Sequence, residues 1–122
     1  MGDRGNIVVQ EQDEAHRVYL YTHWTGSEVE QVARAALASE AGRSRWGDAP
    51  YLARIVFDHM KGDDTTGAVG FGIGARLCDN EHPIVVIDVR DQIVWLEGKD
   101  GEPACGPLTF MAFAAGVAFP PR

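Results

Sequence analysis

The sequence has few cysteines, few lysines and no apolar run long enough to span a membrane, and each absence excludes a class of protein. Its two cysteines form no CxxC pair, which argues against a thiolate zinc site and favours free thiols. The basic residues are dispersed, so we expect no general binding of nucleic acid. The longest nearly apolar stretch, 108–119, has twelve residues, whereas a membrane span needs about 18. No signal-peptide pattern opens the chain, so we expect a cytoplasmic protein with no membrane partner.

The composition is that of a small acidic globular protein. Eighteen acidic and eleven basic side chains in 122 residues give a formal net charge of −7. One domain commonly uses about 100–200 residues, so we expect a single domain over residues 1–122. An apolar share of 45% is sufficient for one core and argues against disorder. A local basic pocket for one small anion is compatible with the net charge.

Apolar runs bounded by turn residues predict about five strands and three helices. The strands cover residues 5–10, 17–23, 67–74, 84–89 and 92–97. The resulting order, β-β-α-α-β-β-β-α, is typical of an α+β fold with a mostly antiparallel sheet.

The three helices are predicted from their end signals. Ser27 and Glu30 have the spacing of a capping box, and Gly42 suits the end of the helix that they begin. The second helix starts at Pro50 and ends at Gly62. The third is the apolar stretch 108–119, which we interpret as a buried helix.

Three glycines alternate in the strand predicted at 67–74. Gly70, Gly72 and Gly74 fall on one face, which therefore has no side chains. The letters match the G-x-G-x-x-A dinucleotide fingerprint, but no helix is predicted to follow, so we do not expect a dinucleotide site. A bare face indicates close approach of a neighbouring helix, an aromatic ring or a ligand, and packing is the favoured reading.

Aromatic side chains with polar tips lie on the strand predicted at 17–23. Tyr19, Tyr21 and His23 share one face, and Trp24 follows at its end. Such side chains suit a pocket for a planar ligand, and they equally suit the edge of a core under a helix. The helix predicted to start near Ser27 directs free backbone N–H groups to the same region, where a small anion could bind.

The most polar stretch of the chain is the loop 78–83. Asp79, Glu81 and His82 are candidate metal ligands, and His23 and His59 could converge with His82. Their spacing matches no known metal cage, so a solvated loop without metal is the favoured reading.

The sequence lacks a recognisable catalytic motif. It contains no G-x-S-x-G nucleophile elbow, and the neighbours Asp58 and His59 point about 100° apart on a helix. We therefore assign no catalytic residue and no cofactor, and we favour a protein that is not an enzyme.

Five segments carry a resemblance when they are taken together: M-G-D-R-x-N-I at 1–7, Y-L-Y-T-H-W at 19–24, R-W-x-D with Y-L-A-R-I at 45–55, G-F-G-I at 70–73 and D-N-E-H-P at 79–83. They resemble a family of short bacterial and bacteriophage proteins. The family has no established activity, so the resemblance implies no catalytic or binding residue. It implies a small accessory protein that binds a host component or a small signalling molecule.

Binding of a small, anionic, nucleotide-like ligand is the favoured function. The candidate ligand-binding residues are Tyr21, His23, Trp24, Arg54, Asn80 and His82. Arginine forks suit phosphates, and Arg45, Arg54 and Arg76 are available for an anion. This hypothesis predicts a concave pocket containing Tyr21, His23 and an arginine.

Two alternatives remain open. The first is an acidic interaction or inhibitor module that binds a host protein. The second is a metal-dependent hydrolase that uses His23, Asp79 and His82. A homo-oligomer is compatible with any of these functions.

Overall fold

The computed structural model describes residues 2–120 and contains one six-stranded sheet in the order β3-β2-β1-β4-β5-β6. The strands are β1 (Gly5–Gln10), β2 (Arg17–Thr22), β3 (Phe71–Gly74), β4 (Ile84–Asp88), β5 (Ile93–Glu97) and β6 (Pro103–Thr109). Every neighbouring pair is antiparallel except the central β1 and β4, which are parallel. The predicted α+β fold with a mostly antiparallel sheet is confirmed, with one strand more than expected.

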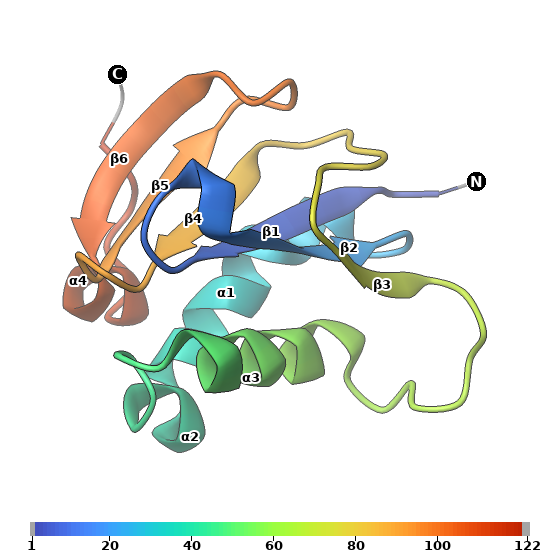
Figure 1. The fold of residues 1–122 in the computed structure, drawn as a ribbon, viewed down its shortest axis with the longest axis horizontal. Helices are drawn as coiled ribbons and strands as arrows, with labels where there is room; N and C mark the ends of the chain where they lie inside the picture. Colours follow the sequence, from blue (N-terminus) through green and yellow to red (C-terminus); the bar gives the residue numbers. More distant parts are fainter. Residues whose placement is uncertain (1, 121–122) are drawn as a thin grey trace.

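Among residues 2–120, the α-helices cover one face of the sheet only. The α-helices are α1 (Val29–Ala38), α2 (Glu40–Arg43), α3 (Ala49–Lys61) and α4 (Phe110–Ala114), and two short 3₁₀ helices are η1 (Glu14–His16) and η2 (Gly26–Glu28). Figure 1 shows α1 and α3 below the sheet, while the segment that joins β3 to β4 crosses above it. Within residues 2–120, no helix has the length and apolar composition that crossing a membrane requires.

The two faces of the central strands bury different sets of side chains, because alternate residues of a strand point to opposite faces. The face towards the helices contributes Ile7, Val9, Leu20, Val85 and Ile87 to the main core. The opposite face buries a smaller cluster of Val8, Ile84 and Val86, with Tyr19, Leu77 and Trp95 packed against it. In the part of the chain that the structure describes, no α-helix packs on this second face.

The helix α3 forms where the sequence predicts it. The side chain of Asp48 accepts a hydrogen bond from the N–H of Tyr51, and Pro50 lies in the first turn, where a missing N–H costs nothing. Gly62 ends the helix with φ of +54°, a backbone conformation that disfavours other residues.

The predicted start of the first helix is wrong in detail. The Ser27 hydroxyl does not cap the helix, because it donates to Asp3 Oδ2 at 2.7 Å, and the chain at 26–28 forms η2 before α1 begins at Val29. The predicted continuous helix to Gly42 is also interrupted. Ser39 is extended and accepts a hydrogen bond from the N–H of Gly42, so α2 is a separate turn.

The predicted helix 108–119 is the largest error. Residues 103–109 form the sixth strand β6 instead, and α4 covers only Phe110–Ala114. Leu108 lies opposite Val94 in the sheet, and Thr109 caps α4 by accepting from the N–H of Ala112. An apolar run without clear periodicity satisfies a strand followed by a short helix as well as one buried helix.

Candidate functional site

The face of the sheet without helices contains a pocket of about 250 Å³ at its β2–β3 end. Its lining residues are Asn6, Tyr19, Tyr21, Gly72, Ile73, Gly74, Ala75, Arg76 and Cys78. They come from three adjacent strands and from the segment that leaves β3. The pocket therefore lies where the predicted glycine face and the predicted aromatic face meet.

The register of β2 and β3 places a glycine beside each tyrosine. Tyr21 lies opposite Gly72, and Tyr19 lies opposite Gly74. Residues directly opposite in an antiparallel pair point to the same face. The two tyrosine side chains thus stand beside a part of the sheet that has no side chains, and the glycine backbone forms the floor of the pocket.

The space around each of the three glycines shows whether packing requires the absence of a side chain there. Gly70 has φ of +106°, and a Cβ there would lie 2.2 Å from Nε1 of Trp24, so an aromatic ring occupies that space. A Cβ at Gly72 would meet nothing within 4 Å, and one at Gly74 would be in ordinary contact with the Arg76 carbonyl at 3.7 Å. Packing, the favoured reading, therefore accounts for Gly70 but for neither of the glycines in the pocket.

Asn6 lies at the base of the pocket and links the sheet to the 78–83 loop. Its Nδ2 donates to the Asp79 carbonyl at 2.9 Å and to Asn80 Oδ1 at 3.1 Å. Both contacts assign the amide orientation, and they leave Oδ1 buried without a hydrogen-bond partner among residues 2–120. A buried acceptor left unsatisfied costs about 1–3 kcal/mol.

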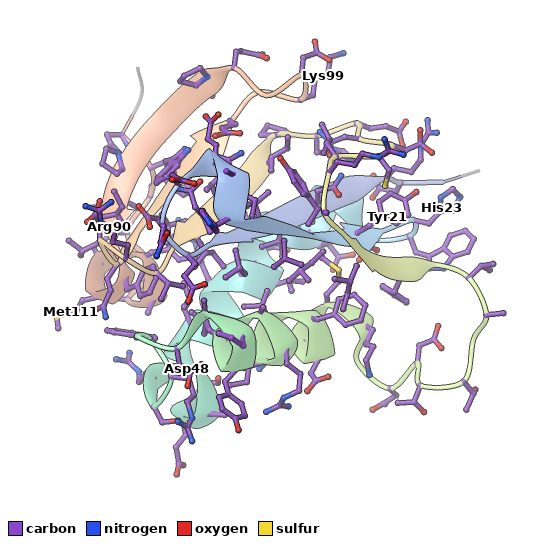
Figure 2. All side chains as sticks on the ribbon, viewed as in Figure 1. Tyr21, His23, Asp48, Arg90, Lys99 and Met111 are labelled. Atoms are coloured by element: carbon purple, nitrogen blue, oxygen red, sulfur yellow. The ribbon has the colours of Figure 1, made fainter. Side chains whose placement is uncertain are left out.

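Tyr21, His23 and Trp24 form a connected aromatic group. The Tyr21 hydroxyl is 2.9 Å from His23 Nδ1, and the His23 and Trp24 rings meet edge to face at 4.6 Å. Burial, with a smaller effect of the Asp79 carboxylate, raises the pKa of Tyr21, so its hydroxyl keeps its proton and can donate to His23. Figure 2 shows Tyr21 and His23 close together at this end of the molecule.

The arginines do not gather as the anion hypothesis proposed. Arg76 is exposed, lines the pocket, and forms no ion pair among residues 2–120. Arg54 lies on α3, on the other side of the sheet, where its Nη1 contacts Asp58 at 2.7 Å. Arg45 lies near the start of α3 and contacts Asp48 at 3.7 Å. The structure therefore separates Arg54 from the other candidate residues and brings Arg76 to them.

Asn80 and His82 serve the 78–83 loop rather than the pocket. Asn80 Nδ2 donates to the carbonyls of His82 at 2.7 Å and Lys99 at 3.0 Å. His82 Nε2 forms a very short contact with Asp3 Oδ1. The Ser27 hydroxyl and N–H, followed by His82, lower the pKa of Asp3 to about 2.

The candidate metal ligands of this loop are engaged by the N-terminal segment. Glu81 Oε1 accepts from the N–H of Arg4 at 2.9 Å, and Arg4 also lies 3.6 Å from Asp79. Over residues 2–120, no group of three or more His, Cys, Asp or Glu side chains could bind a metal ion.

A buried ion pair occupies the middle of the same face. Arg17 on β2 extends across β1 and β4 to Glu97 on β5, with nitrogen–oxygen distances of 3.1 and 2.8 Å. The two side chains are only 7% and 9% exposed. Gln10 accepts from Arg17 Nε at 2.7 Å, and the Trp95 indole donates to Glu97 at 3.1 Å. The guanidinium therefore has its partners within the chain and is not free for a ligand.

Sequence reasoning missed Asn6 and Cys78 as pocket residues. Asn6 directly precedes the apolar run 7–9 of a buried strand, and a polar side chain buried there needs a polar partner, which is a signal in the sequence. Cys78 enters the pocket only because the chain turns back after β3, which no local pattern indicates. The chain matches no protein-family model, no curated protein and no solved structure when sequence and fold are compared.

Proposed function

We propose that this protein binds a small planar anion, without catalysis, in the pocket between Tyr21, the β3 glycines and Arg76. The single observation that carries the proposal is the side-chain-free floor at Gly72 and Gly74. Glycine inside a strand destabilises the fold by about 0.5–1 kcal/mol relative to alanine. Neither position has a positive φ, and no packing contact demands the absence of a side chain. Because neither backbone conformation nor packing explains glycine at these two positions, we attribute both glycines to access for a ligand.

The lining chemistry supports a ligand of defined character. Tyr19 and Tyr21 offer ring surfaces beside the floor, which suit a flat molecule. Arg76 can form paired hydrogen bonds with a carboxylate or phosphate at the pocket mouth. At the base of the pocket, the unpartnered Oδ1 of Asn6 can accept a hydrogen bond from a donor group of the ligand. A volume of about 250 Å³ favours a molecule near the size of a nucleobase with a short anionic group.

The sequence hypothesis expected Tyr21, His23 and an arginine in one concavity. Tyr21 and Arg76 line the pocket, whereas His23 is not among the lining residues and only forms a hydrogen bond with the Tyr21 hydroxyl. We retain the role of a cytoplasmic accessory protein as part of this proposal. The two free thiols, Cys78 and Cys105, support it, because the cytosol keeps thiols reduced.

Native mass spectrometry of the purified protein tests the proposal first, because a bound small molecule adds mass that is lost on denaturation. NMR titration with nucleoside 5′-monophosphates and with aromatic carboxylates then locates the site. We expect the amide resonances of Gly72 and Gly74 to shift. Gly72→Val should weaken binding at least about tenfold by filling the floor, since a tenfold change corresponds to about 1.4 kcal/mol.

The controls separate a filled pocket from a damaged fold. Valine is favoured in strands, so Gly72→Val should unfold at the same urea concentration as the wild type or higher. Gly47→Ala adds a methyl group in a loop, where the nearest neighbour is Gln92 Nε2 at 4.0 Å, and should bind normally. A clean apo mass together with unshifted Gly72 and Gly74 amides would refute the proposal for these ligand classes.

A further inference from the structure

The two edges of the sheet are built differently. At one edge, β6 contains Pro103 and Pro107, which have no N–H to donate, and its pairing with β5 has two register irregularities. These are features that prevent a further strand from adding to an edge. At the other edge, residues 67–75 include no proline and no ionisable side chain. The β3 edge is therefore open where the β6 edge is blocked.

The hydrogen-bonding groups that face outward from β3 can be identified from its pairing. The N–H of His23 donates to the Gly70 carbonyl at 2.8 Å, and the register continues through Tyr21 and Gly72. Alternate residues of an antiparallel strand use their backbone groups on opposite sides. Phe71 and Ile73 therefore direct their N–H and C=O groups away from β2, to the open edge.

We infer that a second copy of this chain pairs with that edge, β3 against β3 in antiparallel orientation, with the two-fold axis at Gly72. Phe71 of each copy then lies opposite Ile73 of the other. Each of these two residues donates once and accepts once, so four main-chain hydrogen bonds close the contact. A two-fold interface requires a self-complementary surface, and this segment provides one.

The side chains and charges around β3 favour a second copy as the occupant. Ile73 is 61% exposed on the helix side of the sheet, and the pairing covers it with the Phe71 ring of the other copy. Asp64 precedes β3 and folds back to accept from the N–H of Gly67 at 3.0 Å, while Arg76 follows β3. Antiparallel pairing brings the Asp64 end of one copy towards the Arg76 end of the other. The uncharged segment also lets two chains of net charge −7 approach each other.

Sedimentation equilibrium and amide hydrogen exchange test this pairing on the full chain. A four-residue strand pair is a small interface, so we expect a dimer with a dissociation constant in the micromolar range. Between about 10 µM and about 500 µM, exchange of the Phe71 and Ile73 amides should slow, while that of other exposed amides should not. Ile73→Glu places two like charges across the axis and should raise the dissociation constant at least about tenfold.

Met111→Glu is the matched control, because Met111 is 68% exposed on α4 and lies far from β3 (Figure 2). It should leave the dimer unchanged. Ile73→Pro is a second test, since it removes an outward N–H that no strand of residues 2–120 uses, and it should also prevent pairing. A monomer at about 500 µM overturns the inference, as does equal weakening by Ile73→Glu and Met111→Glu. The dimer and the proposed pocket share Gly72, Ile73 and Arg76, so their readouts separate the two proposals. Sedimentation and edge-amide exchange without ligand report the dimer, and ligand-induced shifts of the Gly72 and Gly74 amides report the pocket.

Discussion

Removing one member of the buried Arg17–Glu97 pair should destabilise the protein more than removing both. Each charge is desolvated, with 7% and 9% of the side chain exposed, and the two groups share paired hydrogen bonds of 2.8 and 3.1 Å. In Arg17→Met, the Glu97 carboxylate keeps only the Trp95 indole among the partners described. In Glu97→Leu, the guanidinium keeps the Gln10 amide oxygen. Either change leaves a buried charge without its counter-charge.

The loss of unfolding free energy in each single variant is set by the buried charge that remains without its partner. Breaking a buried ion pair by removing one partner costs about 3–5 kcal/mol, a large part of the 5–15 kcal/mol that stabilises a typical domain. Replacing both partners by apolar side chains of similar size is often neutral. We therefore expect Arg17→Met and Glu97→Leu each to cost about 3–5 kcal/mol, and the double variant to cost less than either one.

Urea denaturation followed by tryptophan fluorescence measures the free energy of unfolding of each variant, and Trp95 is a direct probe because its indole contacts Glu97. The slope of this free energy against urea concentration should not change, since the surface exposed on unfolding stays the same. Single variants within about 1 kcal/mol of the wild type would show that the pair is effectively solvated. A double variant as unstable as the sum of the singles would refute the coupling between the two charges.

Two further predictions concern pH. Burial, followed by the neighbouring Asp91, raises the pKa of Asp88, so the ionised carboxylate opposes folding at neutral pH and its protonation at low pH relieves this. Asp88→Asn should therefore raise the urea midpoint at pH 7 and lose this effect well below 3.8, the ordinary pKa, where the carboxyl is neutral in the folded and the unfolded chain; an equal gain at both pH values would contradict this reading. The pKa of Asp3 is lowered to about 2 by Ser27 and His82, so its contribution to stability is complete above its ordinary value of 3.8 and is lost as the pH falls through 2. Asp3→Asn should lower the melting temperature at pH 7 but leave it unchanged below pH 2, and a loss that persists in strong acid would indicate a role other than charge.

Local signals predicted the parts of the fold that depend on local chemistry. Pro50 and Gly62 define α3 by their own backbone restrictions, and the apolar strands β1 and β4 are evident from composition. Errors arose where a distant partner decides the outcome. Ser27 donates to Asp3, 24 residues away, instead of capping the helix, and β6 exists because β5 offers it hydrogen bonds.

In the candidate site, too, local sequence patterns predicted some features, whereas others depend on residues that are distant in the sequence. The spacing of Gly70, Gly72 and Gly74 predicted a bare strand face, and the spacing of Tyr19 and Tyr21 predicted an aromatic face. That the two faces adjoin depends on strand order, which the sequence does not specify. Arg54 illustrates the limit, because its chemistry suits an anion but its helix lies on the opposite side of the sheet.

The parallel contact between β1 and β4 has a consequence for how quickly the chain folds. Ile7 faces Val85, 78 positions away, and every other neighbouring pair of the sheet except β2 with β3 joins strands that are close in sequence. Closing so long a loop carries a large entropic penalty before any contact compensates for it. The β1–β2 and β4–β5 hairpins can form early, each on its own, and their joining through β1 and β4 should limit the folding rate. Substitutions at Val8 or Val86, on either side of that junction, should therefore slow folding more than they accelerate unfolding.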